Sequence, residues 1–81
     1  MNQLTPEDYA KAINSIGQDL LERLQLTFKE LDPTLRNNEV LFQGLSAFLV
    51  NVLYQQSPND EEKRQQMLQH LTKIMQEHLT Q

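Results

Sequence analysis

The sequence predicts an all-α fold: a three-helix bundle with antiparallel neighbours, assembled as a homodimer. Apolar residues recur every three or four positions along most of the chain, and Pro33 and Pro58 divide it into three segments. A chain of 81 residues is also small enough to be only marginally stable as a monomer. We therefore expect one helical domain over residues 1–81, with helices spanning about 6–31, 38–56 and 58–79.

The first helix has a well-marked start. Thr5 is a suitable N-cap, Pro6 suits the first helical position, and Asp8 stands three residues after the cap. Gly17 lies beside the apolar stripe, where we favour close approach of another helix over a hinge. The stripe comprises Tyr9, Ile13, Ile16, Leu20, Leu24 and Leu31.

The second helix is apolar on one side and uncharged on the other. No charged residue occurs between Glu39 and Asp60. In a three-helix monomer one side of each helix should meet water, and an uncharged side indicates burial instead. We therefore predict that this side contacts another copy of the chain. The predicted interface residues are Val40, Gly44, Ala47, Val50, Asn51 and Tyr54.

The third helix is expected to begin with Ser57 as its cap and Pro58 in its first position. The acidic residues 60–62 then complement the positive end of the helix dipole. Its apolar stripe comprises Met67, Leu68, Leu71, Ile74, Met75 and Leu79. Across the three helices, the predicted core comprises Ile13, Leu20, Leu24, Leu45, Phe48, Leu49, Leu71 and Met75.

Residues 39–44, with the sequence EVLFQG, resemble the recognition sequence of picornaviral 3C-type proteases that is used in protein expression. The full recognition sequence has leucine before and proline after this hexapeptide, where this chain has Asn38 and Leu45. The segment continues the apolar period through Leu41, Leu45 and Phe48, so we interpret it as native helix. A folded sample should then resist such a protease, because cleavage needs an extended backbone.

Composition argues against several classes of protein. Eleven acidic and seven basic residues give a net charge of −4, which favours a cytoplasmic protein without affinity for nucleic acid or membranes. The chain lacks cysteine, so it has neither disulfides nor thiolate metal ligands. Its start shows no basic stretch followed by an apolar run, and residues 40–54 are too few to span a bilayer.

No arrangement of residues indicates catalysis, a cofactor or a metal. His70 and Glu77 share a helix face, but no third ligand is spaced to complete a site. The serines have no histidine nearby in sequence, and Gly17 and Gly44 are too far apart to form a phosphate-binding loop. We therefore expect a protein that is not an enzyme.

The function predicted from these observations is a helical protein–protein interaction module, homodimeric through its second helix. It would be a small regulator, an adaptor or a chaperone-like subunit for another protein. One alternative is a helix-turn-helix-like DNA-binding regulator, although the basic residues are scattered. The other is an acidic inhibitor that occupies a basic partner site through residues 7–8 and 60–62. The spatial order of the helices, including a domain swap, stays open.

Overall fold

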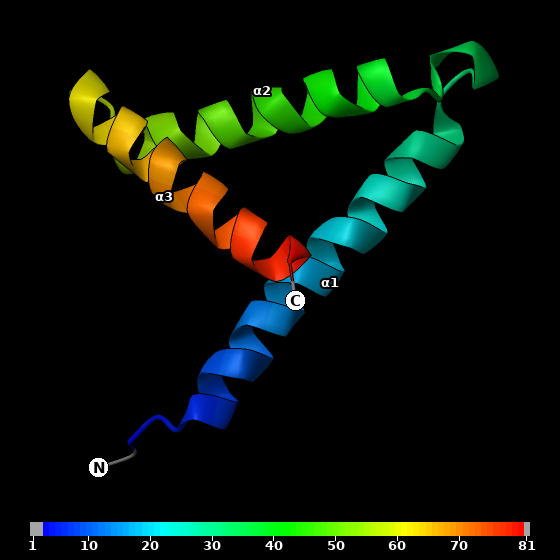
Figure 1. Cartoon of the computed structure of the whole chain (residues 1–81). Coiled ribbons are helices and arrows are strands. Elements are labelled where there is room, and N and C mark those ends of the chain that lie inside the picture. Colours follow the sequence, from blue (N-terminus) through cyan, green and yellow to red (C-terminus); the bar gives the residue numbers. More distant parts are fainter. Residues whose placement is uncertain (1–2, 81) are drawn as a thin grey trace. The chain divides into compact units, whose positions relative to one another are not determined.

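The computed structural model describes residues 3–80, and this part of the chain is helical without strands. It contains α1 (Pro6–Glu30), the short 3-10 helix η1 (Pro33–Leu35), α2 (Asn38–Gln56) and α3 (Glu61–Leu79) (Figure 1). The predicted all-α class with three α-helices is therefore confirmed. The chain forms two compact units, Met1–Asn37 and Asn38–Gln81, and each is described by itself. The single domain, the antiparallel arrangement and the homodimer stay predictions.

The start of α1 is fixed by a reciprocal capping box. The Thr5 hydroxyl accepts a hydrogen bond from the Asp8 backbone N–H at 3.3 Å, and the Asp8 carboxylate accepts one from the Thr5 backbone N–H at 2.8 Å. Pro6 occupies the first turn, where its missing N–H costs nothing. These are the residues that the sequence assigned to the cap, and they satisfy two of the free donors at the helix start.

Carbonyl groups at the end of α1 accept hydrogen bonds from the connection that follows the helix. The Arg36 guanidinium donates from Nε to the Leu31 carbonyl oxygen at 3.0 Å and from an Nη to the Lys29 carbonyl oxygen at 2.6 Å. The Asp32 carboxylate caps η1 by accepting from the Thr34 N–H at 2.9 Å and the Thr34 hydroxyl at 2.7 Å. The connection is thus ordered by hydrogen bonds within its own unit.

α2 has the bounds that the sequence predicted, whereas α3 begins three residues after the predicted Pro58. Its N-cap is Asp60 rather than Ser57, because the Asp60 carboxylate accepts from the Lys63 N–H at 3.0 Å. The Ser57 N–H instead donates to the Leu53 carbonyl oxygen at 3.0 Å, which extends the last turn of α2. Residues 57–60 therefore form a turn, and the carboxylate after the proline provides the cap.

Apolar side chains are not buried in the described residues, which corrects the predicted core. Five of its eight residues are exposed, including Ile13 at 66% and Phe48 at 44%, and Leu24, Leu49 and Leu71 are half-buried. The physical reason lies in the units themselves. A single α-helix cannot enclose its own stripe, and a pair of helices covers only the sides that face each other.

Candidate interaction surface

The six predicted interface residues lie along α2, which positions them by helical spacing. Five of the six follow one another at intervals of four, three, four and three, so they share one side of the helix, and Val50 borders them. We call this set the α2 seam. It comprises Val40, Gly44, Ala47, Val50, Asn51 and Tyr54.

The structure leaves most of the α2 seam open. Val50 is 48% exposed and Tyr54 is 50% exposed; Gly44, Ala47 and Asn51 are exposed too, and Val40 is half-buried. A Cβ added to Gly44 would meet nothing within 4 Å, so a neighbouring backbone could approach this part of α2 closely.

Arg64 of α3 contacts one end of the α2 seam. Its guanidinium lies over the Tyr54 ring, with Cζ 4.3 Å from the ring centroid, and donates to the Ser57 carbonyl oxygen at 2.7 Å. Ser57 is the most covered residue described, at 6% exposure. We call this arrangement the Arg64 latch. Sequence reasoning missed it, although Arg64 stands on the apolar side of α3, seven residues before Leu71, where an arginine needs a partner.

The opposite side of α2 is also only partly covered. Half-buried residues on this side include Leu49, Val52 and Leu53, whereas Phe42 and Leu45 are exposed. α2 contacts α3, from which it is separated by the four residues 57–60. Thus apolar surface remains open on both sides of a helix that carries no charge after Glu39. Such a surface makes α2 the candidate interaction site.

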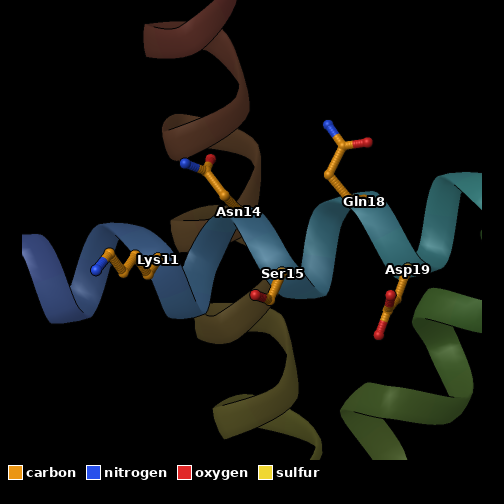
Figure 2. Close-up of a pocket in the computed structure, with 5 residues that line it drawn as sticks. All are labelled: Lys11, Asn14, Ser15, Gln18 and Asp19. Atoms are coloured by element: carbon orange, nitrogen blue, oxygen red, sulfur yellow. The ribbon is translucent and has the colours of Figure 1, made fainter.

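A shallow hollow on the polar side of α1 offers no chemistry. Its lining residues all come from that helix, and all are exposed. Figure 2 shows that Asn14 and Gln18 point to one side while Ser15 and Asp19 point to the other, so these groups do not converge.

Residues 3–80 hold no group of three or more histidine or carboxylate side chains that could hold a metal ion. Within the described helices, none has the length and apolar character needed to cross a membrane.

The pKa of Asp32 is shifted by a clear local cause. Hydrogen bonds from the Thr34 hydroxyl, and then from the Thr34 N–H, lower the pKa of Asp32 below its ordinary value of 3.8. These bonds stabilise the ionised carboxylate. Asp32 caps η1, so the shift reports a structural role and not a reactive site.

Comparison with protein-family models, with curated proteins and with solved structures finds no match for this chain. The choice of function therefore rests on the surfaces of the described residues, and α2 is distinguished among them by the absence of charge after Glu39.

Proposed function

We propose that this chain is a non-enzymatic helical protein–protein interaction module that pairs with a second copy through the α2 seam. It would act as a small cytoplasmic regulator, adaptor or chaperone-like subunit. The observation that carries the proposal is that α2 lacks charge after Glu39 while its apolar residues stay exposed on both sides.

The chemistry of the α2 seam suits a second α2. The α2 seam has no ionised side chain of its own, so the charge that pairing meets is the Arg64 guanidinium at its Tyr54 end. The small side chains of Gly44 and Ala47 allow two helix axes to approach at the short end of the usual range, about 8 Å. The spacing from Val40 to Tyr54 also matches the alternation of three and four residues that lets two helices pack side by side.

Asn51 gives the pairing a means of fixing its register. A single amide within an apolar helix contact must find a partner there, and it thereby selects one alignment over others. Its partner would be Asn51 of the second copy in a parallel pair, or Gln43 in an antiparallel pair.

The test is Ala47→Glu, which would place an unpaired carboxylate in the contact. Sedimentation equilibrium at about 10 μM should show the intact chain at twice its 9.5 kDa mass and the variant near the monomer mass. Gln18→Glu adds the same charge to the polar side of α1 and should leave the dimer intact. Circular dichroism checks that both variants stay helical. A dimer unaffected by Ala47→Glu would refute pairing through this seam.

A further inference from the structure

Opposite charges stand at the two ends of the α2 seam. α2 carries a single charged side chain, Glu39, in its first turn. At the other end the Arg64 guanidinium lies over the Tyr54 ring. Glu39 and Tyr54 are fifteen positions apart, which separates them by about 22 Å along the helix axis. The two charges therefore cannot pair within one chain.

Both charged groups keep hydrogen-bonding capacity. The Arg64 guanidinium has several N–H donors, and within residues 3–80 its contacts are those of the latch. The Glu39 carboxylate accepts from the Gln43 amide at 3.0 Å, and its second oxygen can accept more. Arg64 is already half-buried, so a contact that covers it further is favourable only with a carboxylate beside it.

Glu39 lies on the same edge of the α2 seam as the Tyr54 ring. Four residues at intervals of four, seven and four share this edge, and we call the row the α2 edge. It comprises Glu39, Gln43, Val50 and Tyr54. When two helices pair antiparallel about a two-fold axis, the α2 edge of one copy faces the α2 edge of the other. In a parallel pair it faces the opposite edge instead.

We propose that two copies pair antiparallel through the α2 seam, with a two-fold axis at Ala47, and that Glu39 of each copy pairs with Arg64 of the other. This inference rests on the proposed function and specifies the direction of pairing. Ala47 is the midpoint of the seam, so Val40 lies opposite Tyr54 of the second copy. Glu39 follows the same path and lies beside the ring that carries Arg64 of the second copy.

The polar residues of the α2 seam fit this direction as well. With the axis at Ala47, Asn51 lies opposite Gln43 of the second copy, and both side chains are exposed. The Gln43 amide nitrogen already donates to Glu39, so the Gln43 carbonyl oxygen is left to accept from the Asn51 amide. The antiparallel pair thus provides a partner for Asn51 next to the charge pair.

A parallel pair lacks this complementarity. It places both Glu39 side chains at one end of the pair and both Arg64 guanidiniums at the other, so like charges gather at each end. Like charges that are brought together in an interface oppose binding. The antiparallel pair instead sets a carboxylate against a guanidinium at each end.

Disulfides can report the direction of pairing, because the chain has no cysteine of its own. Three single-cysteine variants of the full chain are oxidised at about 10 μM. Ala47→Cys is the control, because its position on the axis should allow cross-linking in either direction. Asn51→Cys should not link to itself, since its two copies are offset by about 12 Å along the axis. It should cross-link with Gln43→Cys in an equimolar mixture.

Glu39→Lys tests the charge pair. It replaces two attractions with two repulsions and should weaken dimerisation about tenfold in sedimentation equilibrium at low ionic strength. Glu62→Lys is the matched control, because Glu62 is the second residue of α3 as Glu39 is of α2. Both variants therefore lose the same interaction with a helix dipole. The control should dimerise within about twofold of the intact chain.

The pairing and its direction fail separately. Cross-linking of the Asn51→Cys and Gln43→Cys mixture, together with a loss confined to Glu39→Lys, supports the proposal. If Ala47→Cys does not cross-link, the proposed function and this inference are both overturned. If Ala47→Cys cross-links but Asn51→Cys links to itself, or the mixture does not link, only the antiparallel direction is wrong. Unchanged dimerisation of Glu39→Lys, or an equal loss in Glu62→Lys, overturns the Glu39–Arg64 pair.

Discussion

α1 and α2 are both complete α-helices, but they differ in how they end and in what surrounds them. α1 is closed by side chains of its own unit, Thr5 and Asp8 at its start and Arg36 after its end, and its far side is polar. α2 has no charged side after Glu39, and the turn that ends it is held by Arg64 from α3. The difference teaches that α1 needs a cover on its apolar side only, whereas α2 has no charged side to present to water and, in the proposed pairing, is covered on both sides.

The largest expected effect concerns cleavage of α2 between Gln43 and Gly44. A 3C-type protease should cut the intact chain at least about 100-fold more slowly than a synthetic peptide of residues 36–47, because the helix must first open locally. Protection should also increase with chain concentration if a second copy covers α2. The measurement is the appearance of the two fragments by mass spectrometry.

The peptide is also the control, because it shows whether Asn38 and Leu45 are tolerated at the flanks of the recognition sequence. Cleavage of the intact chain at the rate of the peptide would mean that α2 is not a stable helix in solution. α1 and α2 could then no longer be compared as two complete helices.

The next effect tests the dependence of α2 on α3. Arg64→Ala removes a charged hydrogen bond to a carbonyl and a cation–π contact, and should destabilise the turn after α2 by about 2 kcal/mol. Hydrogen exchange of residues 53–64 should accelerate accordingly, while exchange in α1 stays unchanged. Tyr54→Phe keeps the ring under the guanidinium and should behave like the intact chain. Equal acceleration of hydrogen exchange in α1 and in residues 53–64 would show that the effect of Arg64 is not local to the end of α2.

The matching test on α1 is smaller. Thr5→Ala removes one half of the capping box and should destabilise the start of α1 by about 1 kcal/mol. The readout is faster exchange of the amide hydrogens in the first turn, including that of Asp8. Thr5→Ser retains the hydroxyl and serves as the control. An unchanged first turn in the alanine variant would mean that Pro6 and the Asp8 carboxylate fix the start of the helix without the Thr5 hydroxyl.

The sequence predicted local structure far better than burial. Caps and prolines act within a few residues, so α1 starts where Thr5 and Pro6 indicate. Ser57 and Asp60 both have cap chemistry near Pro58, and only geometry decides between them. Burial depends on contacts far apart in sequence, which is why Ile13 and Phe48 were assigned to a core but are exposed. The α2 seam could be predicted because α2 has no charged residue after Glu39. The contacts of Arg64 with Tyr54 and Ser57 could not be predicted, because they depend on how residues 57–60 turn.

The smallest expected effect concerns the connection after α1 and depends on pH. The pKa of Asp32 is lowered by the Thr34 hydroxyl and then the Thr34 N–H, so its ionised form stabilises the folded connection. That stabilisation is complete above the unfolded value near 3.8 and disappears as the pH falls through the lower folded value. Nuclear magnetic resonance titration of the Thr34 amide between about pH 6 and 2 should show this midpoint. Asp32→Asn should abolish it, and Thr34→Val should move it back toward 3.8. An Asp32 midpoint at or above 3.8 in the intact chain would show that these hydrogen bonds do not hold the connection in solution.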